Sequence, residues 1–413
     1  MSESLGRGLI LAVGFENVEE LDENNYRVSP GSSAEVAEVI ARARAHKAAV
    51  HPLGAGGRPQ RGSDGARPRV FLSTKRLDQV LQLDEMSLLV HAQVGLTGLE
   101  LERILAPRNL SLGDYPPVVL TSSLGGIIAV RTPGKSSARH GFFEDAVVGV
   151  SAVLADGRTV HTRIAPRRST GPDLARALCG SEGTIGFITS AVLRIHKKPE
   201  ARLVAAYIVP SIDAAISAVY LALREEALPS GLRLYDAAEA ALHFDGLALP
   251  PQSVLVCAAT AGPTDLAACD RDLITSAVLA EGGRATDTAL ADLWWRRTHA
   301  GEPSPGVSPS LQVMATPSKL RPVYHAIVDH AASLNITARA HISRFDADGA
   351  VLFFTLVDGA EPAAPSVVAA CERAAHTAGG WLLGARATKL DAYLRDLRDA
   401  IDPDRIMNPG TLA

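Results

Sequence analysis

The stretch from Ser169 to Thr189 places a break of small residues between an amphipathic turn and a long apolar run. The break, Cys179 to Thr184, contains two glycines, and the apolar run that follows extends from Ile185 to Ile195. Glycine has no Cβ and tolerates positive φ, so such a break lets the backbone approach a ligand closely. A single break of this kind is weak evidence for a site. The other segments of the chain decide whether it belongs to one.

The length of the chain indicates more than one domain. It has 413 residues, 47% of them hydrophobic and 21% charged, which describes a soluble globular protein too long for one ordinary core. We therefore expect two domains. The formal net charge is −4 and no long run has a single sign, so nucleic acid is not an expected partner.

Cysteine usage and the N-terminal residues point to a reducing compartment. The four cysteines are scattered and form no Cys-x-x-Cys pair, which argues against a zinc site, an iron–sulfur cluster and a disulfide framework. The first 14 residues do not resemble a secretory signal, and no apolar run approaches the roughly 20 residues that span a bilayer. We expect a cytoplasmic protein with no metal and no integral membrane segment.

A second glycine-rich segment follows the apolar run of residues 48–53. Four glycines stand between Gly54 and Gly62, and consecutive N–H groups in such a loop can converge on phosphate oxygens. The spacing is neither G-x-G-x-x-G before a helix nor G-x-x-x-x-G-K-[ST], which disfavours a nicotinamide-binding Rossmann site and a P-loop. An exposed flexible loop is the alternative interpretation.

Hydrophobic periodicity and turn residues predict the regular elements. A third glycine-rich segment lies at residues 122–129, and Asp156-Gly157 predicts a hairpin turn after the strand at 146–154. In the second half we expect strands at 203–209 and 254–260, helices at 212–224, 265–279, 322–333, 366–378 and 387–401, and a hairpin of 337–343 with 351–356.

Four motifs in a fixed order carry a resemblance to a known family. They are PLGAGGRPQRG from Pro52, SSLGGIIA from Ser122 with HGFFEDAVVG from His140, STGPDLARALCGSEGTIGFIT from Ser169, and DPDRIMNPG from Asp402. Together they resemble the vanillyl-alcohol-oxidase superfamily of proteins with a PCMH-type FAD-binding domain. The third motif is most similar to alkyldihydroxyacetonephosphate synthase and to FAD-linked oxidases like it, and the likeness covers nearly the whole chain.

The resemblance implies an α+β fold with two domains. A two-lobed FAD-binding domain would span residues 1–200 and be completed by the C-terminal helix of residues 387–413. A cap domain for the substrate, residues 201–386, would hold an open mixed or antiparallel sheet covered by helices. The family also suggests a homodimer or a partner redox subunit.

The same resemblance assigns residues to the cofactor. Covalent attachment in this superfamily uses a His or Cys in defined loops, and residues 54–62 contain neither; we therefore expect noncovalent FAD. The expected cofactor residues are Pro52, Gly54, Ala55, Gly56, Gly57, Arg58, Pro59, Ser122, Ser123, Gly125, Gly126, Gly134, His140, Gly141, Glu182, Gly183 and Ile188. A surface or structural histidine is the alternative interpretation of His140.

Three departures from the family concern chemistry. In the first loop Arg58-Pro59 replaces small residues, and Pro59 removes one N–H donor, which the Arg58 guanidinium could offset by pairing with phosphate. The synthase and its relatives carry histidines after a Gly-Gly pair, whereas Gly379-Gly380 is followed by WLLGAR. The strand that holds a tyrosine in the synthase reads VLFFT here, at residues 351–355, and Phe cannot exchange a proton.

The remaining catalytic candidates are His341, Arg233, Arg344 and Arg386, with Asp346 nearby. Arg233, in a strand similar to the arginine strand of the synthase, could bind a phosphate or carboxylate in a bidentate manner, although a structural arginine is an equal alternative. His341 shares a strand face with Ser343 and is the best acid/base candidate if that face looks at the flavin. A packed strand histidine is the alternative.

These residues lead to an expected function and two rivals. We expect an FAD-dependent oxidoreductase that acts on a small hydroxylated or phosphorylated substrate at the flavin N5. The first rival is a transferase of the alkyldihydroxyacetonephosphate synthase type in ether-lipid synthesis, against which the missing histidines and tyrosine count. The second is an FAD-binding subunit or degenerate homologue without catalysis of its own.

Overall fold

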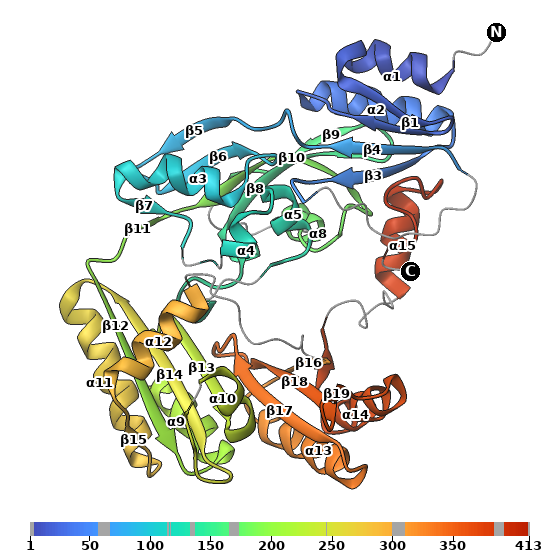
Figure 1. Ribbon diagram of the computed structural model, residues 1–413. Helices are drawn as coiled ribbons and strands as arrows, with labels where there is room; N and C mark the ends of the chain where they lie inside the picture. Colours follow the sequence, from blue (N-terminus) through green and yellow to red (C-terminus); the bar gives the residue numbers. More distant parts are fainter. Residues whose placement is uncertain are drawn as a thin grey trace.

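The computed structural model describes residues 4–56, 67–113, 115, 117–132, 137–164, 173–244, 246–299, 310–383 and 392–411. The first half, up to Lys197, contains three small sheets (Figure 1). The second half, from Ala201 to residue 383, contains one large sheet with helices on both faces. No helix in these residue ranges is both long and apolar enough to cross a membrane.

The first lobe is a four-stranded sheet packed under two helices. The strand order is β1-β2-β4-β3, with β2, β4 and β3 parallel and β1 antiparallel to β2. The Ser32 hydroxyl caps the second helix by accepting the Glu35 N–H at 3.1 Å. The elements are α1 (Leu5–Val13), η1 (Phe15–Asn17), β1 (Val18–Asp22), β2 (Asn25–Val28), α2 (Ser33–Ala45), β3 (Ala49–Leu53) and β4 (Arg69–Ser73).

The second lobe is a five-stranded antiparallel sheet with short helices. Its order is β5-β6-β10-β8-β9, and the turn at Asp156-Gly157 joins β8 to β9, as the sequence predicts. Its strands are β5 (Val80–Asp84), β6 (Leu89–Gln93), β8 (Val147–Leu154), β9 (Thr159–His161) and β10 (Gly186–Arg194), with β7 (Leu110–Ser111) and β11 (His196–Lys197) paired separately. Its helices are α3 (Gly98–Leu105), η2 (Ala106–Arg108), α4 (Pro117–Leu120), α5 (Leu124–Ala129), α6 (Ser137–His140), α7 (Phe143–Ala146) and α8 (Leu174–Leu178).

The second half is built on one open sheet in which every pairing is antiparallel. Its order is β15-β12-β14-β13-β17-β18-β16-β20, with β19 paired to β18. The strands are β12 (Ala201–Val209), β13 (Gly231–Asp236), β14 (Val254–Gly262), β15 (Arg284–Ala285), β16 (Leu311–Ala315), β17 (Thr337–Ser343), β18 (Ala350–Asp358), β19 (Glu361–Pro362) and β20 (Trp381–Leu382).

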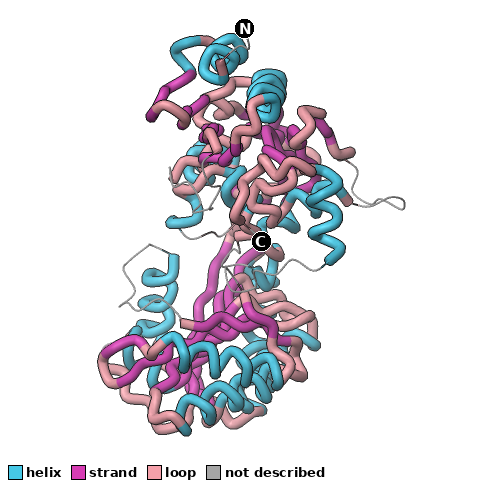
Figure 2. The backbone as a smooth tube through the Cα atoms, turned by 90° about the vertical axis from the view of Figure 1, so that its right-hand side faces the viewer, coloured by secondary structure: helices cyan, strands magenta, loops and turns pink. Residues whose placement is uncertain are grey.

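Two sets of helices cover the two faces of this sheet. One face packs a large core under α9 (Ile212–Arg224), α11 (Thr264–Ala280), α13 (Leu320–Ser333) and α14 (Pro365–Thr377). Figure 2 shows helices along the lower, outer side of the molecule. The other face packs a smaller cluster with α10 (Ala237–His243) and α12 (Thr288–His299). Alternation along each strand therefore sends side chains to two apolar clusters, one on each face of the sheet.

The last helix, α15 (Ala392–Ile401), returns the chain to the first half (Figure 1). Beyond it, Met407 pairs with Val50 of β3, and Ile406 and Met407 join the core of the first lobe. The predicted α+β fold, with two lobes and an open sheet covered by helices, is confirmed, and the sheet is antiparallel rather than mixed. The domain boundaries at residues 200 and 386 stay a prediction.

Candidate functional site

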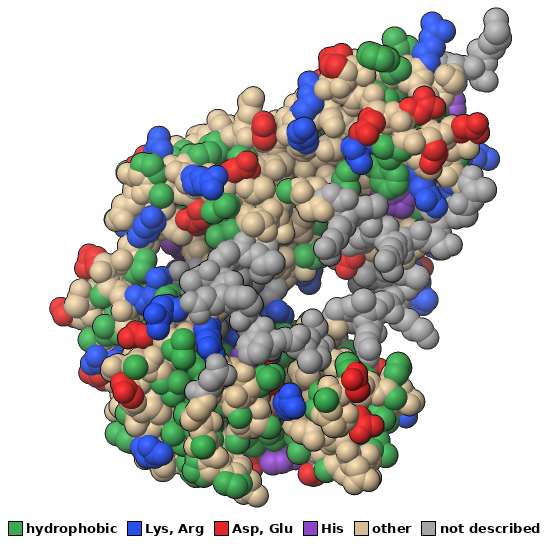
Figure 3. Space-filling model, viewed as in Figure 1, with side chains coloured by type: hydrophobic (Ala, Val, Ile, Leu, Met, Phe, Trp, Pro, Cys, Tyr) green, Lys and Arg blue, Asp and Glu red, His purple; other side chains and the backbone are tan. Residues whose placement is uncertain are grey.

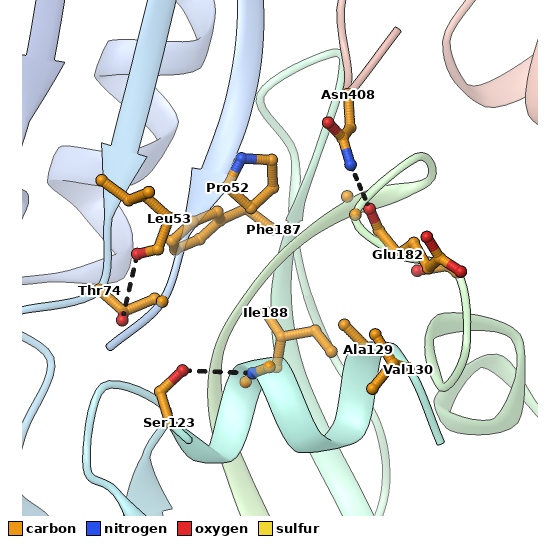
Figure 4. Close-up of a pocket in the computed structure, with 16 residues that line it drawn as sticks. Pro52, Leu53, Thr74, Ser123, Ala129, Val130, Glu182, Phe187, Ile188 and Asn408 are labelled. Carbon is orange, nitrogen blue, oxygen red and sulfur yellow. Dashed lines mark hydrogen bonds between the residues drawn. The ribbon is translucent and has the colours of Figure 1, made fainter. Parts of the chain in front are cut away.

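A pocket lies where the two lobes of the first half meet (Figure 4). Its walls come from the end of β3, the segments before and within α5, the turn before β10, and the C-terminal segment. Eight of the residues predicted to hold the cofactor line it: Pro52, Gly54, Ser123, Gly125, Gly126, Glu182, Gly183 and Ile188. The remaining lining residues are Leu53, Thr74, Ala129, Val130, Ser181, Gly186, Phe187 and Asn408.

Asn408 fastens the parts of this pocket to one another. Its side-chain amide donates to the Glu182 carbonyl at 2.6 Å, and its Oδ1 lies 3.1 Å from His51 Nδ1. Its own N–H donates to the Val50 carbonyl at 2.8 Å. The side chain is buried, and φ is 43°, a left-handed conformation that Asn tolerates better than most residues. One residue thus ties the C-terminal segment to both lobes.

Glycine is required at two points of the pocket wall. A Cβ on Gly54 would lie 2.6 Å from Ser123 Oγ, and a Cβ on Gly183, where φ is 76°, would lie 2.6 Å from Pro52 Cγ. Ser123 is itself buried and accepts the Gly126 N–H at 3.3 Å. The three glycine-rich segments are therefore in direct contact.

The lining chemistry suits a ligand with a flat apolar part and an anionic part. Ala129, Val130, Phe187 and Ile188 give the pocket an apolar wall (Figure 4). The hydroxyls of Ser123 and Thr74 and the backbone of Gly54 add neutral polar groups to the lining. The N–H groups of Gly125 and Gly126 already donate to the Val94 carbonyl and to Ser123 Oγ. Hydroxyl and backbone groups of this kind can bind a phosphate.

Several predicted cofactor residues lie elsewhere or outside the described residues. The Ser122 carbonyl accepts the Gly98 N–H at 3.2 Å, Ala55 and Gly56 are exposed, and Gly141 packs against Asp145. The ring of His140 stacks on His196 at 3.9 Å and lines a different cleft. Gly57, Arg58, Pro59 and Gly134, and the catalytic candidate Arg386, lie outside the residues that the structure describes.

The second half holds a buried carboxylate between two histidines. Glu239 Oε1 on α10 lies 3.1 Å from His341 Nδ1 on β17 and 3.0 Å from His243 Nε2. Glu239 is only 4% exposed. An ionised carboxylate accepts hydrogen bonds and does not donate them, so both imidazole nitrogens must carry protons. The other nitrogen of a neutral His341, Nε2, then keeps a free lone pair, and it has no hydrogen-bond partner among the described residues.

Burial and hydrogen bonding fix the charges in this cluster. Burial alone would raise the pKa of Glu239, but the hydrogen bonds from His243 and His341 outweigh it and leave that pKa at about 2. Burial lowers the pKa of His341 to about 4, even though the Glu239 hydrogen bond works in the opposite direction. At neutral pH Glu239 is therefore ionised and His341 is neutral. A neutral imidazole with a free nitrogen can accept a proton.

Two arginines, Arg233 and Arg344, lie beside this cluster. Arg233 on β13 donates to the Tyr235 hydroxyl at 3.3 Å, and Arg344 lies 5.0 Å over the Phe353 ring. Burial, and then repulsion from Arg233, lower the pKa of Arg344 to about 10. Neither guanidinium forms an ion pair with any residue that the structure describes. Two adjacent, partly desolvated cations favour an anionic ligand.

The structure brings His341, Arg233 and Arg344 together on one face of the sheet. Arg233 pairs in register with Ser343, and the His341 ring stacks on Phe353 at 4.7 Å. Asp346 instead closes a turn, because its carboxylate accepts the N–H groups of Asp348 and Gly349. The helix α6 of the first half packs against β13, so this strand adjoins the first half.

Sequence reasoning missed four residues of these two sites. Glu239, His243 and Tyr235 complete the histidine and arginine cluster, and Asn408 completes the pocket. Glu239 and His243 are four residues apart in AAEAALH, directly after the strand that carries Arg233. That spacing on a helix next to a candidate site is the signal that could have found them.

Two family models together match almost the whole chain. Residues 7–163 match an FAD binding domain, and residues 198–412 match the C-terminal domain of FAD linked oxidases. A solved structure of alkyldihydroxyacetonephosphate synthase superposes with a TM-score of 0.71 at 22% identity, covering 93% of this chain and 75% of that one. At this identity the superposition shows the fold alone.

Two curated relatives illustrate the range of the family. The uncharacterized FAD-linked oxidoreductase YgcU of Escherichia coli (strain K12) is 28% identical over 291 residues, which are 70% of this chain and 60% of YgcU. The glycolate oxidase subunit GlcD of Bacillus subtilis (strain 168) is 28% identical over 211 residues, which are 51% of this chain and 45% of GlcD. The matched region is thus less than two thirds of either relative. This chain belongs to the family of FAD-linked oxidases, and FAD is its cofactor.

Proposed function

We propose that this protein is an FAD-dependent dehydrogenase or oxidase of a small hydroxylated substrate that carries a carboxylate or a phosphate. The observation that supports this proposal best is the face of β13 and β17, where two arginines that form no ion pair with a described residue lie beside a neutral histidine. Bound FAD supplies the acceptor for the two electrons of the oxidation.

In this proposal the pocket between the lobes holds the cofactor noncovalently. The backbone of Gly54 and the Ser123 hydroxyl would hold its anionic part, and Phe187 and Ile188 would pack against its flat part. The Asn408 side chain donates a hydrogen bond to the Glu182 carbonyl and so positions the turn of Glu182 and Gly183 at the pocket wall. The fit rests on the glycines, the hydroxyls of Ser123 and Thr74 and the apolar wall of the pocket.

The residues at the β13 and β17 face of the large sheet have separate roles in this proposal. Arg233 and Arg344 bind the anionic group of the substrate, and Tyr235 orients Arg233. His341 accepts the proton of the substrate hydroxyl at Nε2, while Glu239 fixes the ring through Nδ1. A bound anion would raise the pKa of His341, because an opposite charge nearby favours the imidazolium. A weakly basic histidine in the free protein thus becomes a better base once substrate is present.

Curated relatives that are named alkyldihydroxyacetonephosphate synthase favour a second candidate, a transferase of that type. Two features oppose it: β18 carries Phe353 and Phe354 where the synthase carries a tyrosine, and no histidine follows Gly379-Gly380. A protein that binds FAD without its own catalysis, as a subunit of a larger oxidase, is the third candidate. A homodimer or a partner redox subunit accords with any of the three.

One anaerobic experiment separates these candidates. The purified, FAD-loaded protein is mixed with a panel of 2-hydroxy acids and hydroxyalkyl phosphates, and bleaching of the flavin absorbance is followed in time. The proposal expects at least one compound to bleach the flavin, and His341→Ala to slow bleaching with the resting spectrum unchanged. His376→Ala, at an exposed histidine of α14, is the control and keeps the wild-type rate. Ether formation from acyl-dihydroxyacetone phosphate and a fatty alcohol would favour the transferase, and yellow protein that no compound bleaches would favour the third candidate.

A further inference from the structure

A second cleft lies at the junction of the two halves, on the side where β7, β11 and the start of β12 meet. It has a volume of about 780 Å³ and shares no lining residue with the cofactor pocket. The first half contributes His140 and His196, and the second half contributes Arg202, Ser230 and Gly262. Figure 3 shows Lys and Arg side chains gathered at this junction, on the left of the view.

The charge of this junction cleft is strongly unbalanced. Four cations line it (Arg139, Lys197, Lys198 and Arg202), and Glu200 is the one acidic residue among the described residues of its lining. Arg139 lies 3.9 Å from Asp270, and Arg202 lies 4.5 Å over the Trp295 ring. Lys197 and Lys198 have no acidic partner in the part of the chain that the structure describes. The protein as a whole carries a net charge of −4, so this local excess is not a property of the surface in general.

The two lysines extend from a fixed backbone. Lys197 is paired with Leu110 of β7, and the Lys198 N–H donates to the Asn109 carbonyl at 2.9 Å. The backbone that carries both lysines is therefore fixed in the absence of a ligand, and their exposed side chains line the cleft from it.

Two stacked imidazoles form the floor beside these cations. The His140 and His196 rings are 3.9 Å apart, and Gly113 leaves room next to both of them. Burial is the main cause that lowers the pKa of His140, to about 3, and repulsion from His196 and Arg139 adds to it. Burial also lowers the pKa of His196, together with repulsion from Arg194 and Arg139. Both rings are therefore neutral at pH 7, and each presents one N–H donor without adding charge.

We propose that the junction cleft is a binding site for a small phosphate-bearing anion, separate from the cofactor pocket. A phosphate carries close to two negative charges at neutral pH and several strong acceptor oxygens. It would match the lysine ammonium groups, the Arg202 guanidinium and the imidazole N–H groups together. Because its ligands come from both halves of the chain, such an anion would bridge them. This inference does not depend on the substrate proposed above.

Isothermal titration of the FAD-loaded protein tests the proposal. The probes are inorganic phosphate, pyrophosphate and glycerol 3-phosphate, each at constant ionic strength, so that a free phosphate is distinguished from a phosphate ester. We expect saturable binding of at least one probe with one site per chain. Lys197→Ala combined with Lys198→Ala should weaken it about tenfold, which corresponds to about 1.4 kcal/mol shared between two exposed charge pairs. Arg202→Gln should weaken it as well, from the opposite wall.

The control removes two positive charges away from the cleft. Arg284→Ala combined with Lys319→Ala, both at exposed positions, should leave the affinity unchanged. Equal weakening by the two double variants would show general electrostatic attraction and overturn the proposal. So would the absence of saturable binding for all three probes, or release of FAD during the titration, which would place the anion in the cofactor pocket. An unchanged flavin spectrum in each variant confirms that the fold is intact.

Discussion

Glu239 sets the protonation of two histidines at the same time. Its carboxylate is buried and accepts hydrogen bonds from His341 and His243, so it stays ionised well below neutral pH. His341 in turn stays neutral well below the usual imidazole pKa, because burial outweighs the effect of Glu239. The arrangement holds one imidazole nitrogen as a donor and leaves the other as an acceptor. A positioning role for Glu239 follows from this geometry.

The first prediction concerns the pH dependence of flavin reduction. Neutral His341 is the reactive form, and its pKa is about 4, so the second-order rate of reduction by substrate should hold down to about pH 5 and fall as pH drops through 4. An ordinary histidine would lose its rate near the usual value of 6.5. Glu239→Gln removes the group that raises the His341 pKa, so the acid limb should move to lower pH while the plateau rate falls.

Anaerobic stopped-flow measurements between about pH 3 and 8 give this profile. The flavin spectrum of Glu239→Gln reports whether the cofactor site has stayed intact. An acid limb near 6.5 in the wild type, or a plateau that Glu239→Gln leaves untouched, would contradict the assignment of His341 as the base.

At the scale of elements, Asn408 joins the C-terminal segment to β3 and to the turn before β10. Asn408→Gly keeps the left-handed backbone available but removes the side-chain bonds to Glu182 and His51. Losing a buried hydrogen bond costs about 1–3 kcal/mol, so we expect a lower melting temperature and a smaller ratio of flavin to protein absorbance. Asn335→Gly, at an exposed asparagine whose φ is 58°, is the matched control and should change neither quantity. Equal effects of the two substitutions would mean that the Asn408 side chain does not fasten the pocket.

Asp236, at the end of β13, is hydrogen-bonded to three other elements of the second half, which are α10, β17 and α13. Its carboxylate caps α10 by accepting the Glu239 N–H at 2.8 Å, and it accepts the Ala340 N–H of β17 at 2.8 Å and the Tyr324 hydroxyl of α13 at 3.3 Å. Burial nevertheless raises its pKa from 3.8 to about 6. A carboxyl group whose pKa is higher in the folded state stabilises the protein fully below its unfolded pKa. That stabilisation is lost as pH rises through the folded pKa.

A comparison of wild type with Asp236→Asn tests this linkage. Between pH 4 and 7 the wild type should lose about 2 kcal/mol of unfolding free energy relative to the variant, which cannot titrate. Asn also lacks the second acceptor oxygen, so the variant should be the less stable protein at pH 4. The measurement is the urea midpoint of both proteins across this range. The stability of the wild type relative to Asp236→Asn should decrease toward pH 7. If it does not change with pH, or if it increases, the pKa of Asp236 is not raised in the folded state.

Local elements could be predicted from the sequence because their signals are local. The helix predicted at 212–224 is α9, and the Asp156-Gly157 turn stands between β8 and β9. The order of the strands in the large sheet could not be predicted, because β13 pairs with β17 across about a hundred residues and periodicity does not identify a partner. Glu239 was missed for the same reason: its partner His341 is close in space only after β13 and β17 have paired.

At the scale of the whole molecule, the cofactor pocket depends on contacts between segments far apart in the chain. Gly54, Ser123 and Gly183 meet there, and Asn408 closes the assembly from the C-terminal side. Residues 406 and 407 also fill the core of the first lobe, so the tail is part of that lobe although the entire large sheet precedes it in sequence. Binding of FAD should therefore stabilise the association of these segments rather than a single loop.

The last prediction follows from this coupling. A ligand at one hundred times its dissociation constant stabilises the folded state by about 2.7 kcal/mol, which corresponds to roughly 5–10 °C in melting temperature for a domain of this size. FAD added to the protein after removal of its flavin should raise the melting temperature by that amount. The increase should be smaller in Asn408→Gly, whose pocket is not fastened, and unchanged in His341→Ala, whose substitution lies in the large sheet. Scans at one fixed rate keep irreversible unfolding comparable between samples. If FAD raised the melting temperature of Asn408→Gly as much as that of the wild type, the prediction would be wrong. The stabilisation of the protein by FAD would then not depend on the contact between the two lobes and the C-terminal segment.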